Sequence, residues 1–287
     1  MDIGRGGVEG VAFGRRHALS NTSARSLLLT VLGELVLPYG EPVWTSAFVE
    51  VLGRLGVEEK SARQALTRGA SEGWLAAERI GRRARWSLTP SGRRLLSEGA
   101  ERIYSFQAAQ QSWDGRWLLL VVSVAESARR RRHQLRTRLR WAGFGSPAPR
   151  LWVSPQASRE AEAREIVEEL GLAGTAMSFI AGFADIGEQR TIVDQAWDLG
   201  DLSARYEDFI VEFAGQAPEA GDAVLLAQIR LVHAWRRFPF LDPGLPTRLL
   251  PPGWSGSRAS DLFHDKHKAW HDGAQARWAE ITRGGRR

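Results

Sequence analysis

The feature that most constrains the fold is a very short connection between two helical patterns near the N-terminus. Apolar residues recur at helical spacing from Phe48 to Leu55 and stop at Gly56. A new helical pattern resumes after Val57, with Ala62 among its inward positions. So short a link forces the two helices to cross at a steep angle, as in a helix-turn-helix.

The surrounding elements extend this unit over residues 23–110. An earlier helix carries Leu28 to Leu35 at helical spacing, and Thr45 is expected to cap the second helix. Alternating stretches flank the basic tip Gly81 to Ala84, which is typical of a hairpin, and Thr89-Pro90 predicts a last helix. The order helix, helix, helix, hairpin, helix predicts a winged helix-turn-helix DNA-binding domain.

Two further domains are expected after it, so the predicted fold class is α+β multidomain. Residues 111–185 alternate strand-sized apolar runs with amphipathic helices, which predicts a central ferredoxin-like α+β domain with one of its four strands unassigned. Residues 143–147 are expected to break the first of these helices, a short strand is expected at Leu151 to Val153, and a last strand is expected at Thr175 to Ala181. Residues 186–283 predict a helical C-terminal domain for effector binding and dimerisation, ending in a helix from Asp261 to Ile281.

Composition excludes several classes of protein. The chain has no cysteine, which excludes a disulfide scaffold, a cysteine nucleophile and thiolate metal ligands. No apolar run is long enough to cross a membrane, and the Gly-rich N-terminus lacks the apolar core of a secretory signal. A cytoplasmic protein without a membrane partner is therefore expected. With 39 basic against 33 acidic residues the net charge is +6. The charges are unevenly distributed, since residues 127–159 hold many arginines and no acid whereas residues 185–222 are mostly acidic. This asymmetry suggests a polyanion-facing end and a separate acidic module.

The outward side of the third helix predicts contact with base edges in double-stranded DNA. Arginine pairs with guanine and glutamine with adenine, while serine and threonine serve bases or phosphates. A solvated helix face is the alternative, but the short turn before the helix and the basic hairpin after it favour DNA. The expected contacts are Ser61, Arg63, Gln64, Thr67 and Arg68.

The hairpin arginines are expected on phosphates or in the minor groove, where they bind without reading sequence. A run of four arginines from Arg129 to Arg132 carries a weaker signal of the same kind, since consecutive residues cannot share one helix face. The hairpin set consists of Arg79, Arg82, Arg83 and Arg85.

Neither a cofactor nor a metal site is predicted. His264, His267 and His271 lie at i, i+3 and i+7, but the neighbouring Lys266 and Lys268 disfavour a cation, so a solvated helix face is expected.

An enzyme is not expected either. A metal-dependent nuclease in the central domain is the alternative function, and it would need paired carboxylates. Asp114 and Asp185 border the central strands but form no convincing pair.

Several long motifs follow one another along the chain: Ser61 to Arg68 with Glu72-Gly73-Trp74-Leu75, Gly81-Arg82-Arg83, Trp113 to Trp117, Leu139 to Gly145, and His233 to Pro243. Together they resemble the PaaX family, the repressors of phenylacetate-degradation operons, and the resemblance covers roughly Ser23 to Trp270. It implies a winged-helix domain, a central ferredoxin-like domain similar to a small CRISPR-associated nuclease fold, and a helical C-terminal domain. It also implies a homodimer on a palindromic operator and release by an aryl-CoA, usually phenylacetyl-CoA.

One of these motifs is a candidate effector site. An aryl-CoA needs apolar walls for its aryl group and cations for its phosphates. Trp235, Arg236, Arg237 and Phe238 supply both kinds of side chain before a Pro-rich loop. Alternatively, the two rings pack the helix while the arginines pair with the acidic stretch from Asp194 to Asp222.

Overall fold

The computed structural model describes residues 23–106, 113–184 and 186–284. It has mixed α and β structure, with two antiparallel sheets. The chain divides into two compact units. Unit 1 comprises the segments Met1–Ser105, Phe209–Arg237 and Ala259–Arg287. Unit 2 comprises Phe106–Asp208 and Phe238–Arg258. These packing units group the chain differently from the three domains expected along it, whose boundaries stay a prediction. Asp185 and the boundary residues 107–112 lie outside the described residues.

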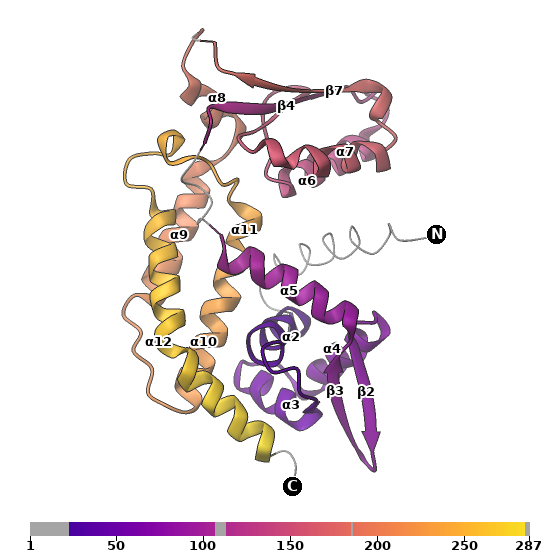
Figure 1. Ribbon diagram of the computed structural model, residues 1–287, viewed down its shortest axis with the longest axis vertical. Helices are drawn as coiled ribbons and strands as arrows, with labels where there is room; N and C mark the ends of the chain where they lie inside the picture. The colour runs from indigo at the N-terminus through magenta and orange to yellow at the C-terminus, as the bar shows by residue number, and fades with distance from the viewer. Residues whose placement is uncertain (1–22, 107–112, 185, 285–287) are drawn as a thin grey trace. The chain divides into compact units, whose positions relative to one another are not determined.

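The N-terminal part of unit 1 contains the expected order of helices and hairpin (Figure 1). Ser23 begins the first helix, because its side chain accepts a hydrogen bond from the Ser26 amide. The elements are α2 (Ala24–Val31), the π-helical turn η1 (Leu32–Val36), β1 (Val43–Trp44), α3 (Thr45–Arg54), α4 (Glu59–Ser71), β2 (Leu75–Ile80), β3 (Arg83–Leu88) and α5 (Pro90–Tyr104).

The prediction that Thr45 caps helix α3 is wrong. Trp44 occupies the N-cap position, and Thr45 is the first helical residue. The Thr45 hydroxyl donates to the Ala84 carbonyl at 3.0 Å and accepts from Trp86 Nε1 at 2.8 Å. Thr45 therefore ties the helix to strand β3 instead of capping it.

The hairpin has a tight turn and a firm base. Strands β2 and β3 pair from Leu75↔Leu88 to Ile80↔Arg83, so Gly81 and Arg82 form a two-residue turn. Gly81 has φ +61°, a conformation that glycine adopts without strain. At the base, Thr89 caps α5, which begins at proline as expected.

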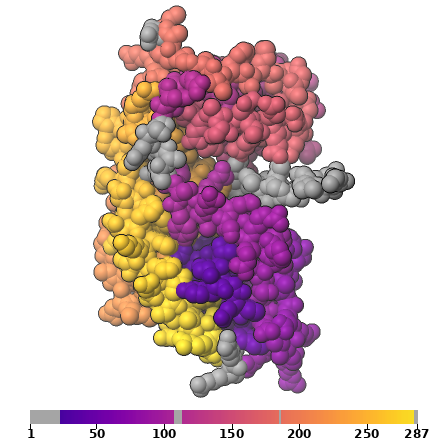
Figure 2. Space-filling model, in the orientation of Figure 1, coloured from indigo at the N-terminus to yellow at the C-terminus, as the bar shows by residue number. Residues whose placement is uncertain are grey.

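C-terminal helices complete the core of unit 1. Helix α10 (Asp222–Trp235) belongs to it, as do the later parts of α9 (Leu199–Phe213) and α12 (Ser255–Gly284), which begins earlier than expected. Leu225 and Trp278 belong to the same buried cluster as Leu28 and Phe48, and the Phe48 and Trp278 rings lie 5.9 Å apart. Figure 2 shows the yellow C-terminal helix lying against the indigo N-terminal segment.

Unit 2 is built around a four-stranded sheet with the order β5-β6-β4-β7. One sheet face packs against α6 and α7 through a cluster that includes Leu118, Leu139 and Ile166 (Figure 1). The elements are β4 (Arg116–Val122), α6 (Arg129–Trp141), β5 (Gly145–Ala148), β6 (Leu151–Ser154), α7 (Glu160–Glu169), β7 (Ala176–Gly182), α8 (Gln189–Ala196) and α11 (Phe238–Leu241), with single 3-10 turns at Ala157–Arg159, Ala173–Thr175 and Thr247–Leu249.

Strand β5 is the strand that the sequence left unassigned. The residues expected to break the preceding helix do so, because α6 ends at Trp141, but they also begin this strand, since Gly145 pairs with Val153. A Cβ at Gly145 would lie 2.5 Å from both Ala196 and Trp197, so only glycine permits this close approach.

Among the helices of the residues that the structure describes, none combines the length and the apolar character that a membrane span requires.

Candidate nucleic-acid interface

Helix α4 separates an inner apolar side from an outer polar side. Ala62, Ala65 and Leu66 are buried in the core of unit 1. Most of the predicted base-contacting residues are exposed on the other side, whereas Ser61 is half-buried. The sequence therefore identified the outward face of this helix, and the exposed members are Arg63, Gln64, Thr67 and Arg68.

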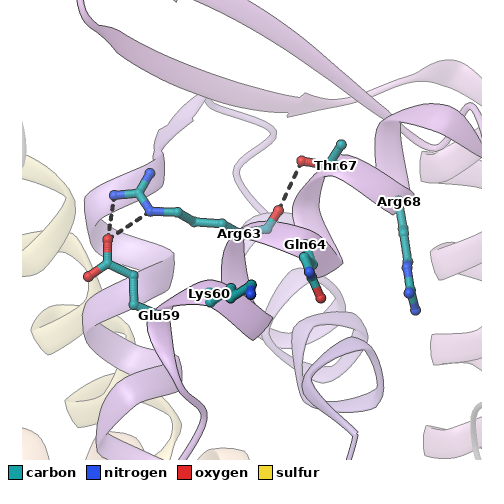
Figure 3. Close-up of a pocket in the computed structure, with 6 residues that line it drawn as sticks. All are labelled: Glu59, Lys60, Arg63, Gln64, Thr67 and Arg68. Atoms are coloured by element: carbon teal, nitrogen blue, oxygen red, sulfur yellow. Dashed lines mark hydrogen bonds and ion pairs between the residues drawn. The ribbon is translucent and has the colours of Figure 1, made fainter.

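These side chains line a shallow hollow of about 710 Å³ together with Glu59 and Lys60 (Figure 3). Gln64 and Arg68 extend in the same direction, whereas Arg63 turns toward Glu59, with 2.7 Å between Arg63 Nε and Glu59 Oε1. The Thr67 hydroxyl donates to the Arg63 carbonyl at 3.0 Å. Sequence reasoning left out Lys60 and this ion pair, although the i, i+4 spacing of Glu59 and Arg63 is a signal for it.

The hairpin does not hold its four arginines on one side. Arg79 pairs with Ala84 and shares the face of the buried Trp86, whereas Arg83 and Arg85 lie on the opposite face. Arg85 forms a 2.7 Å ion pair with Glu78, while Arg82 is exposed in the turn. The positive charge of the hairpin is therefore concentrated toward its tip.

The run Arg129 to Arg132 forms the first turn of α6 in unit 2 and is exposed. Arg132 donates to the carbonyl of Glu126, and Arg138 further along the helix is paired with Glu169. Two arginines of this basic helix, Arg132 and Arg138, therefore bind groups within unit 2.

The predicted effector residues are divided between the two units along the chain, with residues up to Arg237 in unit 1 and Phe238 in unit 2. Trp235 is fully buried against Phe263, with ring centroids 4.7 Å apart. Arg236 donates to Ser26 Oγ of α2, and burial lowers the pKa of its guanidinium to about 10, with a further contribution from the charge of Arg237. Phe238, in unit 2, stacks on Tyr206 at 4.1 Å. Arg237 is half-buried.

The three C-terminal histidines do not form the solvated face that their spacing indicated. His264 is exposed, and its Nδ1 lies 2.8 Å from the Ser260 carbonyl. His267 and His271 instead approach the buried carboxylate of Glu34 on η1. This cluster was missed because Glu34 reads in sequence as one polar residue in an apolar helix.

Asp114 does not offer a free catalytic carboxylate. Its oxygens accept from the backbone amide and the guanidinium of Arg116, and these contacts lower the pKa of Asp114, the backbone bond most strongly. The other carboxylate considered for a nuclease, Asp185, lies outside the described residues.

The comparisons with known proteins define the class as transcriptional regulators. Three family models match the chain: "PaaX-like protein" over residues 23–92, "PaaX protein central Cas2-like domain" over 110–193, and "PaaX-like protein C-terminal domain" over 197–280. The transcriptional repressor PaaX of Escherichia coli K12 is 34% identical over 260 residues, which cover 86% of this chain and 81% of the repressor.

The chain therefore belongs to the PaaX family, a family of regulators and not of enzymes. A solved structure, the uncharacterized protein Rv0674 from Mycobacterium tuberculosis, has the same fold with a TM-score of 0.60 and 21% identity. The similarity covers 92% of this chain and 99% of that protein.

Proposed function

We propose that this protein is a cytoplasmic DNA-binding repressor of a phenylacetate or related aromatic-acid catabolic operon, and that an aryl-CoA such as phenylacetyl-CoA releases it. The observation that carries the DNA-binding part is the exposed face of α4, where Gln64 and Arg68 point away from the core after the short link at Gly56-Val57. Family membership supports repression, since the E. coli relative is a transcriptional repressor.

In this proposal residues 23–110 form a winged helix-turn-helix. Helix α4 reads the major groove, because a recognition helix presents its outward residues to base edges. The β2–β3 hairpin acts as the wing and places Arg82 and its neighbours on phosphate. Unit 2 supplies a ferredoxin-like domain, whose β-α-β-β-α-β order matches β4, α6, β5, β6, α7 and β7.

Base readout is tested with an operator selected by the full-length protein from a random DNA pool. Arg68→Ala is expected to weaken operator binding by about 1–3 kcal/mol, or roughly 5- to 150-fold, and to relax sequence preference at one position per half-site. Arg94→Ala, on the exposed side of α5, removes the same charge from unit 1 and serves as the matched control. Equal losses of operator affinity in the two variants would show that Arg68 contributes only its charge and does not read a base.

Phosphate binding by the wing has a different signature. Arg82→Ala is expected to weaken specific and random DNA about equally, and to reduce the slope of log affinity against log salt by about one unit. Fluorescence anisotropy on both DNAs over a salt series measures the two quantities. A slope unchanged from that of the wild type would remove Arg82 from the interface.

The protein is proposed to act as a homodimer. Residues 186–283 are the expected dimerisation domain, where Val211 is 80% exposed. Unit 2 offers a second apolar surface, since Met177 and Phe179 are 60% and 52% exposed on the sheet face opposite α6 and α7. Light scattering of Val211→Lys and Phe179→Lys tests which surface dimerises the chain, and a monomer identifies it.

Release by an effector requires the aryl-CoA to bind the DNA-free form more tightly than the operator-bound form. Trp235, Arg236, Arg237 and Phe238 are the proposed contacts. The buried bond from Arg236 to Ser26 joins this segment to α2 and supplies a route to the DNA-binding elements. Phenylacetyl-CoA, phenylacetate and CoA are each titrated against a preformed operator complex. We expect release by the first alone, loosening binding about 5- to 150-fold, and a reduced response in Arg237→Ala.

A further inference from the structure

We propose that Glu34, His267 and His271 form a binding site for a divalent transition-metal ion of the Zn²⁺ class. Glu34 Oε1 lies 2.9 Å from His267 Nε2 and 3.6 Å from His271 Nδ1. All three ligand atoms lie within 4.8 Å of one another. In a tetrahedral site with bonds of about 2.0–2.1 Å, neighbouring ligand atoms stand about 3.3 Å apart. The two contacts of Glu34 thus differ from tetrahedral spacing by only a few tenths of an ångström.

The donor atoms suit such an ion. His267 and His271 are one turn apart on α12, so both imidazoles project from the same side of the helix. Two imidazoles at this i, i+4 spacing, with a carboxylate from another element, are ligands that Zn²⁺ accepts. Glu34 comes from the π-helical turn η1, an irregularity often found at functional sites.

Two buried polar atoms beside Glu34 lack a hydrogen-bond partner among the described residues: His271 Nδ1 and Gln228 Oε1. A buried acceptor without a donor is costly, and a bound cation would satisfy it. Gln228 Nε2 donates to Glu34 Oε1 at 2.8 Å. Turning the amide by 180° would exchange its nitrogen and oxygen, which gives the ion a fourth ligand, the amide oxygen.

Groups around the ligands already orient the carboxylate. The Tyr104 hydroxyl donates to Glu34 Oε2, whereas the histidine contacts are to Oε1, and Gln275 Nε2 donates to the Glu34 carbonyl at 2.9 Å. Such outer contacts commonly hold metal ligands in position.

One of the two lysines that were expected to disfavour a cation, Lys266, is directed elsewhere. Lys266 Nζ donates to the Gln216 carbonyl at 2.7 Å and lies 5.5 Å from the centre of the Trp270 ring. A bound ion would join η1 to α12, two segments of unit 1 more than 230 residues apart, and so stabilise the packing of the C-terminal helix on the N-terminal segment.

The test uses the full-length protein without a histidine tag, stripped with EDTA and dialysed, with Zn²⁺ and Co²⁺ as probes. We expect one Zn²⁺ per chain by elemental analysis and the intense visible bands of tetrahedral Co²⁺. Zn²⁺ at about 100 times its Kd should raise the Tm by about 5–10 °C. Absence of both retained Zn²⁺ and Co²⁺ bands in the folded wild type would overturn the proposal.

Matched variants locate the ion. His271→Ala removes a half-exposed ligand and should weaken Co²⁺ binding by more than about tenfold, while Tyr104→Phe should weaken it by about 10- to 100-fold through the carboxylate. His264→Ala, on the same helix but outside the cluster, should bind like the wild type. Circular dichroism confirms folding, and Glu34→Gln replaces any variant that fails to fold. Binding that is unchanged in both His271→Ala and Glu34→Gln would assign the ion to another place and overturn the proposal.

Discussion

Two buried carboxylates, one in each unit, have opposite protonation behaviour. Glu34 in unit 1 is 4% exposed and Asp242 in unit 2 is 5% exposed. Each accepts a hydrogen bond from a tyrosine, Tyr104 for Glu34 and Tyr206 for Asp242. The pKa of Glu34 is nevertheless lowered, and the pKa of Asp242 is raised.

The neighbours explain the difference. Burial acts most strongly on both groups and raises the pKa of each carboxyl. At Glu34 this effect is outweighed by the hydrogen bond and charge of His267, with hydrogen bonds from Tyr104 and Gln228. At Asp242 the bonds from Tyr206 and the Gly244 amide only partly offset it. Burial alone therefore does not set the charge of a carboxyl; the donors around it do.

The largest expected effect contrasts the amide variants of the two residues. Glu34→Gln removes the charged acceptor of several hydrogen bonds and should lower the free energy of unfolding by about 2–3 kcal/mol. Asp242→Asn replaces a carboxyl that burial already disfavours in its charged form, so we expect a neutral or stabilising change. Urea unfolding in the presence of EDTA, followed by circular dichroism, measures both. Equal losses would show that the two carboxyls have the same character.

The pH dependence should have opposite signs. Because the folded pKa of Glu34 lies below the ordinary value of 4.5, its stabilisation is complete above that pH and is lost as the pH falls through the folded pKa. The folded pKa of Asp242 lies above 3.8, so its cost to stability is absent below 3.8, grows as the pH rises from there toward the folded pKa, and is complete above it.

Thermal melts of the wild type and both amide variants from about pH 3 to pH 8 test these signs. In EDTA, the stability difference between the wild type and Glu34→Gln should shrink on acidification below 4.5. The advantage of Asp242→Asn over the wild type should grow as the pH rises. Parallel curves for all three proteins would contradict the assigned pKa directions.

A smaller contrast comes from the two tyrosine hydroxyls. Tyr104→Phe removes a donor to a charged carboxylate and should cost about 1.5–3 kcal/mol, while Tyr206→Phe removes a donor to a carboxyl that favours its neutral form and should cost about 0.5–1.5 kcal/mol. Both substitutions keep the aromatic ring, so packing is conserved. Urea midpoints for the two variants at pH 7 give the ranking, and a larger loss in Tyr206→Phe would reverse it.

What the sequence could predict depended on how local each signal was. The helix pattern through Leu66 and the Thr89-Pro90 start of α5 depend on neighbours within a few turns, and both are found as expected. Strand β5 was missed because its Gly-Ser-Pro-Ala sequence has the composition of a loop, and only pairing with β6 makes it a strand. His267, a partner of Glu34, lies 233 residues further along the chain, so no spacing rule finds it.

The exposed face of α4, which we propose to contact DNA, follows the same principle, with one exception. Helical periodicity predicts which positions of α4 point outward. It therefore also predicted Arg63 and Arg68 as candidate base-contacting residues. Arg79 and Arg83 lie on opposite faces of the hairpin because of the register of its two strands. The sequence did not determine this register, because it did not show that the turn consists of Gly81 and Arg82 alone. Periodicity thus predicted which residues are exposed, but register was needed to say which of them act together.

The smallest effect concerns a third carboxylate, Glu59, whose side chain is 61% exposed in the hollow on α4. Glu59→Gln should change the free energy of unfolding by no more than about 0.5 kcal/mol, because exposed ion pairs contribute little. It should still raise DNA affinity, by about 1.5- to 5-fold at low salt, because it removes a negative charge near the phosphates and releases Arg63. Glu98→Gln on the exposed side of α5 is the control for net charge. Anisotropy at low and high salt should show the gain fading as ions screen the charges; a large loss of stability in Glu59→Gln would instead place this carboxylate with the buried pair.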